Sequence, residues 1–206
     1  KYLLFGIFQL FLYKFSKRMI LPIVAYGSPI LKKEAEEIDE NYEKLDELIE
    51  NMFETMYEAS GVGLAAPQID KSIRLFIVDA SPFAEDEEGN EETDPKAAGL
   101  KGFKKVFINP IIEEETGEEW PFAEGCLSIP NIREEVLRQE KIKISYYDEN
   151  WEFHEEEYEG YAARIIQHEY DHVEGILFTD HLSPLKKRML KKIKMLLNFL
   201  KKLKIK

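Results

Sequence analysis

The residues with the clearest chemical potential lie in the stretch "IIQHEYDH", which covers residues 165–172. His168 and His172 are four residues apart, so on a helix they project from the same face, about one turn from each other. Both imidazoles can therefore reach one metal ion. Glu169 is rotated by about 100° from His168, which places its carboxylate beside such an ion, where it can hold and deprotonate a water molecule. This H-E-x-x-H spacing is typical of a catalytic metal site.

Two histidines need a third protein ligand, because catalytic zinc-like sites keep three protein ligands and one open position for water. Glu174 and His181 follow the histidines, but neither stands at the spacing of a familiar metalloprotease pattern. Cys126 precedes them, and a thiolate is a strong ligand for a divalent cation. A glycine and a proline near this cysteine break regular structure around it, which is unusual for a plain core residue. The residues alone leave a metalloprotease and a metal-stabilised binding module open.

Secondary structure must position these side chains, and the apolar pattern predicts both helices and strands. Apolar residues at helical spacing predict helices at about 41–59, 160–174 and 183–203. Alternating and β-branched residues predict strands at 73–80 and 105–110 and a hairpin within 141–160. The sequence therefore predicts an α+β fold with mostly antiparallel strands around a central metal-binding helix, and with an N-terminal and a C-terminal helix.

The 206-residue chain is predicted to form one domain over residues 19–206, since 44% hydrophobic residues can bury one core. Residues 1–18 contain an apolar run shorter than the roughly 20 residues of a membrane span. We expect them to be upstream or added sequence, with a surface helix as the alternative. Residues 85–99 are acidic and contain Gly and Pro, which predicts an exposed insertion without core residues. A single cysteine, Cys126, excludes an internal disulfide and suits a reducing, cytoplasmic location.

The charge of the chain is distributed unevenly along the sequence. The formal net charge is −12, yet residues 183–206 contain ten Lys or Arg and no Asp or Glu. The acidic body argues against DNA binding. The apolar side of the tail can pack on the body, whereas its basic side indicates docking at the ribosome through RNA phosphates, or at an acidic membrane surface.

Three segments together resemble the signature motifs of the peptide deformylases, namely "GVGLAAPQ" (61–68), "EGCLSIP" (124–130) and "QHEYDH" (167–172). The resemblance keeps the order of the motifs and covers about residues 19–190. It implies a metal-dependent hydrolase that removes the N-formyl group from the N-terminal formyl-methionine of newly made polypeptides and releases formate. It also implies Fe²⁺ as the native ion, with Zn²⁺, Ni²⁺ or Co²⁺ in preparations, and Cys and His ligands suit all four ions.

The resemblance also implies roles for individual residues around the metal. The implied metal ligands are Cys126, His168 and His172. Glu169 is expected to act as general base and then as proton donor to the leaving amine. Glu124 and Arg133 are expected to form a charged pair that steadies the cysteine loop.

Other residues are expected to bind the substrate. The side-chain amide of Gln68 and the backbone N–H of Leu127 would stabilise the oxyanion of the tetrahedral intermediate. Gly63 has no side chain and could present its backbone to an extended peptide, which would pair like an added strand. The candidates for the pocket around the methionine side chain are Val62, Tyr161 and Ile165.

Overall fold

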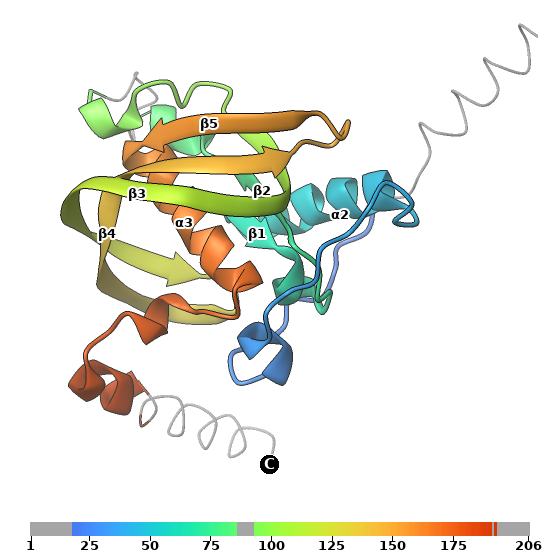
Figure 1. The fold of residues 1–206 in the computed structure, drawn as a ribbon. Helices are drawn as coiled ribbons and strands as arrows, with labels where there is room; N and C mark the ends of the chain where they lie inside the picture. Colours follow the sequence, from blue (N-terminus) through green and yellow to red (C-terminus); the bar gives the residue numbers. More distant parts are fainter. Residues whose placement is uncertain (1–17, 86–92, 191, 193–206) are drawn as a thin grey trace, which may run out of the picture.

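The structure, a computed structural model shown in Figure 1, describes residues 18–85, 93–190 and 192. Nearly all of the predicted N-terminal extension, the centre of the acidic insertion and most of the predicted tail helix lie outside these residues. The described part of the chain is an α+β fold with a five-stranded antiparallel sheet in the order β1-β2-β3-β4-β5. The fold class predicted from the sequence is therefore confirmed.

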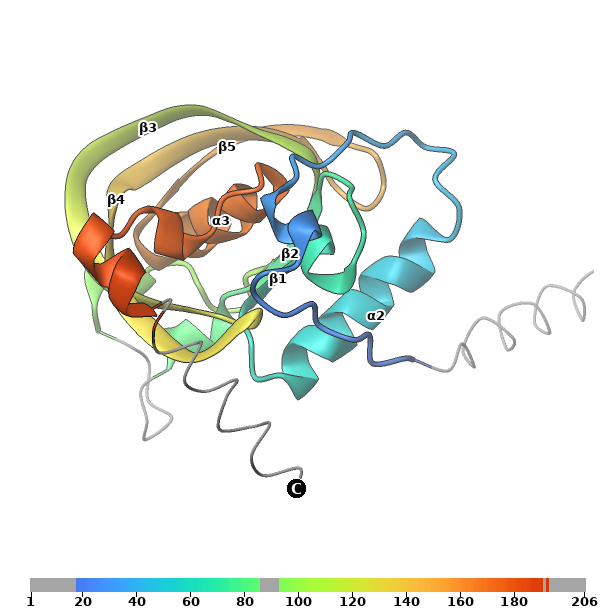
Figure 2. The same cartoon turned by 90° about the horizontal axis from the view of Figure 1, so that it is seen from below.

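The sheet is dominated by one long hairpin. The strands are β1 (Gly63–Ala65), β2 (Leu75–Asp79), β3 (Lys104–Cys126), β4 (Ile129–Tyr147) and β5 (Phe153–Glu159). β3 and β4 pair along nearly their whole length, with several register shifts, and such bulges bend a strand and increase its twist. Figure 2 shows that the two strands curve around α3 as a result.

The predicted strands at 73–80 and 105–110 and the hairpin within 141–160 correspond to β2, the start of β3 and the β4–β5 pair. The sequence pattern did not indicate that residues 111–126 and 129–140 are also strand. Much of this segment consists of glutamates, which have low strand propensity, and backbone pairing between β3 and β4 supports it instead.

The two longest helices described lie on different parts of the sheet. They are α2 (Leu45–Glu58) and α3 (Gly160–Val173). The short 3₁₀ segments are η1 (Pro29–Lys32), η2 (Ala66–Ile69), η3 (Ser81–Ala84), η4 (Pro95–Ala97) and η5 (Phe178–Asp180). Residues 184–190 are helical, which agrees with the predicted start of the tail helix. None of the helices in the described part of the chain is long and apolar enough to span a bilayer.

The core has two main parts, one beside each of these helices. α3 packs into the concave side of the sheet against β1, β2, β4 and β5, and its buried partners include Phe76, Phe107, Ile144 and Tyr146. α2 packs against β1 and β2, with Met52 and Met56 fully buried beside Leu64, Leu75 and Ile77. The apolar stripe of α2 therefore covers one part of the sheet, while α3 is enclosed by the other.

The acidic insertion contributes more to the core than its composition predicts. Ala97 is only 6% exposed and belongs to the cluster around α3. Gly160, the first residue of α3, has φ +61°, and a Cβ there would lie 2.4 Å from the carbonyl oxygen of Lys96. The expectation of an insertion without core residues is therefore wrong for residues 93–99, because a buried alanine and a tight backbone contact fix them against α3.

Candidate metal centre

Two separate elements bring three metal-binding side chains together. His168 and His172 lie one turn apart on α3, and Cys126 is the last residue of β3. The Sγ atom of Cys126 lies 3.3 Å from Nε2 of His172, and one donor atom from each of the three residues lies within 4.8 Å of the others. The cysteine stands at the tip of a hairpin in which Cys126 pairs with Ile129. Gly125 and Pro130 belong to β3 and β4, but the register shifts between Gly125, which pairs with Arg133, and Cys126. The pairing is therefore irregular beside the cysteine, as the glycine and proline predicted.

The other two candidate ligands are engaged elsewhere. Glu174 forms a 2.6 Å ion pair with Arg74, and Nε2 of His181 lies 2.7 Å from Oδ2 of Asp171. Among the described residues, neither side chain belongs to the cluster of metal-binding atoms that Cys126, His168 and His172 form. The alternatives that the sequence left open for the third ligand are therefore not supported by the geometry.

The donor set fits a divalent transition metal. Ligands bind such ions at about 2.0–2.3 Å, so atoms that share one ion lie within about 4 Å of each other, as Sγ of Cys126 and Nε2 of His172 do. Nδ1 of His168 lies 2.8 Å from the Glu124 carboxylate, which leaves Nε2 of this histidine available as the atom that would bind an ion. A carboxylate in this position orients a metal-binding imidazole.

The charges around the cysteine favour its thiolate form. Burial by itself raises the pKa of the Cys126 thiol, but the neighbouring His172 and His168 outweigh burial and lower this pKa to about 5. In the same way, burial lowers the pKa of His168, while hydrogen bonds with Cys126 and Glu124 raise it well above its ordinary value. The thiolate required of a metal ligand is therefore present at neutral pH before any ion binds.

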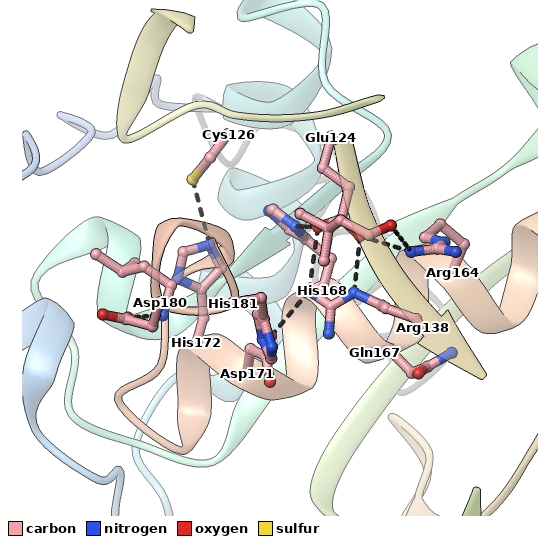
Figure 3. Close-up of polar contacts among 12 residues, drawn as sticks. Glu124, Cys126, Arg138, Arg164, Gln167, His168, Asp171, His172, Asp180 and His181 are labelled. Atoms are coloured by element: carbon pink, nitrogen blue, oxygen red, sulfur yellow. Dashed lines mark hydrogen bonds and ion pairs between the residues drawn. The ribbon is translucent and has the colours of Figure 1, made fainter. Parts of the chain in front are cut away.

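A buried ionic network stands behind His168 (Figure 3). The carboxylate of Glu124 accepts hydrogen bonds from Arg138 at 2.7 and 3.0 Å and from Arg164 at 3.1 Å. Arg138 also forms a 2.8 Å ion pair with Asp171. Burial alone would raise the pKa of Glu124, but these donors and His168 hold it far below its usual range. Glu124 is therefore ionised at neutral pH.

The predicted pairing of Glu124 with Arg133 is wrong. Arg133 is exposed, and its side chain packs over the backbone of Gly125. Arg138 pairs with Glu124 in place of Arg133, because Arg138 is buried, at 6% exposure, on the face of β4 that points toward α3. Arg138, Arg164 and Asp171 were not predicted as site residues. The last two stand four residues before and three residues after His168, so helical spacing could have identified them.

Glu169 is buried beside the metal-binding group without a hydrogen-bond partner for its Oε2 atom among the described residues. Burial raises the pKa of this carboxyl to about 7. A carboxyl with this pKa is suited to accept and return a proton near neutral pH. Gly63 makes room for it, since a Cβ at that position would lie 2.4 Å from Oε1 of Glu169.

Gln68 lies on η2, next to the cysteine. Its Oε1 accepts a 2.8 Å hydrogen bond from the backbone of Ala65, which orients the amide. Its Nε2 therefore faces Cys126 Sγ at 3.4 Å and Ser128 Oγ at 3.3 Å. This amide is a neutral donor held at the edge of the metal-binding group.

A cavity of about 630 Å³ opens onto these groups. Its lining includes the predicted residues Val62, Gly63, Gln68, Leu127, Ile165 and Glu169. Tyr161, predicted as part of the pocket wall, is not among the residues that line the cavity. Its hydroxyl donates instead to Asp94 at 2.7 Å, and its ring packs against Phe83 and Phe122, which do line it.

The fold and this arrangement define a metal-dependent hydrolase, in which a thiolate and two imidazoles can hold an ion next to a carboxyl that can transfer protons. Residues 20–188 match the profile of the polypeptide deformylase family. The chain therefore belongs to this family. The predicted activity, removal of the N-formyl group from nascent peptides, is confirmed, and so is the prediction of a metal-dependent enzyme.

Individual relatives and solved structures agree with this assignment. The chain is 64% identical over 173 residues to a peptide deformylase of Christiangramia forsetii, covering 84% of this chain and 87% of that one. It is 59% identical over 174 residues to a peptide deformylase of Flavobacterium psychrophilum, covering 84% and 88%. The crystal structure of peptide deformylase from Thermotoga maritima matches with a TM-score of 0.67 and 40% identity, covering 81% of this chain and 99% of that one. A Met-Ala-Ser-bound peptide deformylase from Acinetobacter baumannii matches with a TM-score of 0.68 and 34% identity, covering 80% and 99%.

Proposed function

We propose that this site hydrolyses the formyl amide of formyl-methionine at the start of newly made polypeptides, with an ion held by Cys126, His168 and His172. The observation that carries the proposal is the position of Glu169, a buried carboxyl with a pKa of about 7 beside three converging metal donors. An ion at this position would supply a Lewis acid and would make a water molecule ionise near neutral pH.

Glu169 has the central role in the reaction. Its carboxylate accepts a proton from the attacking water, whose oxygen forms a bond to the formyl carbon. The same carboxyl then donates that proton to the amine as the carbon–nitrogen bond breaks, so formate and a free methionine amino group are released. Among the described residues no protein donor binds Oε2 of Glu169, so this oxygen is available for both transfers.

Gln68 and Leu127 stabilise the negative charge that develops on the formyl oxygen. Nε2 of Gln68 is oriented by the hydrogen bond that its Oε1 accepts from Ala65, and the backbone N–H of Leu127, next to Cys126, is the second donor. A donor fixed in this way before the reaction begins stabilises the transition state without reorganisation, and removal of one such donor typically lowers the rate by about 10²–10³-fold.

The first edge of the sheet provides a place for the peptide backbone. β1 pairs with β2 on one side only, and Val62 and Gly63 line the cavity at this edge. An extended peptide can add to such an edge as a further strand, with its main-chain groups hydrogen-bonded. The Met-Ala-Ser ligand named for the Acinetobacter baumannii relative is a peptide of the kind that this site would release.

Release of formate from a formyl-Met peptide tests the proposal. The wild-type protein loaded with metal is expected to release formate, and Glu169→Gln is expected to retain the ion while losing at least about 100-fold in kcat. Cys126→Ala is expected to lose both the ion and the activity. Full activity in either variant would contradict the assigned roles, and metal content measured on the same samples separates loss of the ion from loss of the base.

The resident ion, the location and the ribosome contact are further proposals. Fe²⁺ is the proposed native ion, with Zn²⁺, Ni²⁺ or Co²⁺ as substitutes, and metal analysis after anaerobic purification identifies it. The enzyme is proposed to work in the cytoplasm, with the basic tail beyond Ser183 docking at the ribosome through RNA phosphates. Cosedimentation of the full chain and of a chain ending at Leu185 with ribosomes tests the docking, and equal binding of the two would contradict it.

A further inference from the structure

The apolar end of the cavity is built partly by a residue outside all three sequence motifs. Phe83 lies on η3, just after β2, and lines the cavity together with Val62, Phe122 and Ile165. These four side chains come from four different segments of the chain. Ile165 stands one helical turn before Glu169 on α3, so this apolar end lies next to the groups proposed to perform the hydrolysis.

Phe83 and Phe122 belong to one aromatic wall. The ring centroids of Phe83 and Tyr161 are 5.2 Å apart, and those of Phe122 and Tyr161 are 5.6 Å apart. Trp120 continues the group at 5.8 Å from Tyr161. Tyr161 therefore stands behind the two phenyl rings and supports both of them from the first turn of α3.

The segment after the acidic insertion fixes this wall from behind. The hydroxyl of Tyr161 donates to Oδ2 of Asp94 at 2.7 Å, and Oδ1 of Asp94 accepts from the backbone of Lys96 at 2.9 Å. The Lys96 backbone in turn packs against Gly160 at the start of α3. The support of the aromatic wall is thus a hydrogen-bonded part of the fold.

Phe83 is only partly buried, and its ring packs on the core cluster around α3 while also lining the cavity. In the proposed reaction the formyl carbon must lie beside Glu169, and a few covalent bonds separate that carbon from the side chain of the first residue. That side chain must therefore enter the adjacent apolar end of the cavity. There it would cover the remaining surface of Phe83, and burial of apolar surface favours binding.

We propose that Phe83 is a specificity-determining residue, whose ring closes the apolar end of the pocket so that it admits an unbranched first side chain of methionine length and excludes an aromatic one. The proposal rests on the proposed function of the same site. In an apolar pocket, one methylene more or less changes discrimination by about 10- to 200-fold. Replacement of a whole phenyl ring is therefore expected to change the ranking of substrates measurably.

The test compares formyl-Met-Ala-Ser and formyl-Phe-Ala-Ser as substrates of the wild type and of Phe83→Ala. The ratio of kcat/KM for the Phe peptide to that for the Met peptide is expected to rise by at least about tenfold in Phe83→Ala. Phe83→Trp is expected to make the pocket smaller and to lower kcat/KM for the Met peptide by about tenfold. Phe153→Ala is the matched control, since Phe153 is 60% exposed on β5 and does not line the cavity, and its ratio should equal that of the wild type.

Two outcomes decide between the possible explanations. An unchanged substrate ratio in Phe83→Ala, with normal formate release from the Met peptide, would overturn the specificity role while leaving the proposed function intact. If the wild type released no formate, the proposed function would fail, and the pocket would be judged by binding of the unformylated peptides Met-Ala-Ser and Phe-Ala-Ser. In that measurement Phe83→Ala must gain affinity for Phe-Ala-Ser relative to Met-Ala-Ser, and an equal preference in both proteins would refute the role of Phe83.

Discussion

Gly63 is expected to be essential because its missing side chain leaves space for Glu169. A Cβ at Gly63 would lie 2.4 Å from Oε1, 2.7 Å from Cδ and 2.8 Å from Cγ of Glu169, whereas ordinary contacts begin at 3.4 Å. The carboxylate in Gly63→Ala must therefore move by about 1 Å. A displacement of this size at a catalytic group lowers the rate by about 100-fold, or about 2.7 kcal/mol of activation free energy.

The assay for Gly63→Ala is formate release under steady-state conditions, with metal content and melting temperature measured on the same samples. A fall in kcat of about 100-fold with an unchanged metal content is the expected result. Glu169→Asp should partly restore the activity of Gly63→Ala, because the shorter side chain removes the overlap, although Glu169→Asp alone should be impaired. Activity of Gly63→Ala within about threefold of the wild type, or strictly additive effects of the two substitutions, would refute the reasoning.

Three further results are expected. Arg138→Ala should lower the free energy of unfolding by about 3 kcal/mol, because it removes the buried cation that pairs with both Glu124 and Asp171, while Arg133→Ala should change it by less than about 0.5 kcal/mol; equal losses in urea denaturation would contradict the assigned pair. Burial alone would raise the pKa of Glu156, but hydrogen bonds from neighbouring Lys and Tyr side chains lower it to about 2. The ionised carboxylate of Glu156 therefore contributes its full stabilisation of the folded state above its ordinary pKa of 4.5, and this contribution is lost as the pH falls toward 2. Wild type and Glu156→Gln should thus differ by on the order of 1 kcal/mol at pH 7, allowing for partial exposure, and by less at pH 3; a difference independent of pH in thermal denaturation would argue against this role. A chelator should lower the melting temperature of the wild type but not of Cys126→Ser, since an ion at 100 times its Kd contributes about 2.7 kcal/mol to the folded state; a chelator without effect on the wild type would count against a resident ion.

The parts of the site that depend on local spacing could be predicted from the sequence. His168, Glu169 and His172 follow from the geometry of one helix, and the structure places them as that geometry requires. The contribution of Cys126 depended on a resemblance to known motifs, because its distance from the helix is set by a long hairpin. No local sequence pattern predicts that the tip of the β3–β4 hairpin lies next to α3.

The errors concern contacts between elements whose pairing the sequence does not display. Choosing Arg138 over Arg133 as the partner of Glu124 requires knowing that residues 129–147 form a strand and which face of it points inward. Val136 and Arg138 are buried and share one face, while Arg133 has the opposite parity. Likewise, the distance of Phe83 from α3 depends on the path of a loop, and no periodicity predicts it.

The register in which β3 pairs with β4 sets where the site residues of β3 lie relative to α3. Glu124 and Cys126 both reach α3, through His168 and His172. A slip of one residue in the pairing that places Glu124 would turn its side chain away from α3. From Glu119 to Gly125 the pairing runs without a shift, whereas it is irregular between Thr116 and Glu119. The register shifts again between Gly125 and Cys126. Insertions and deletions should therefore be tolerated in this family between Thr116 and Glu119 and rejected between Glu119 and Gly125, so that the length of this regular segment is as much a part of the enzyme as its ligands.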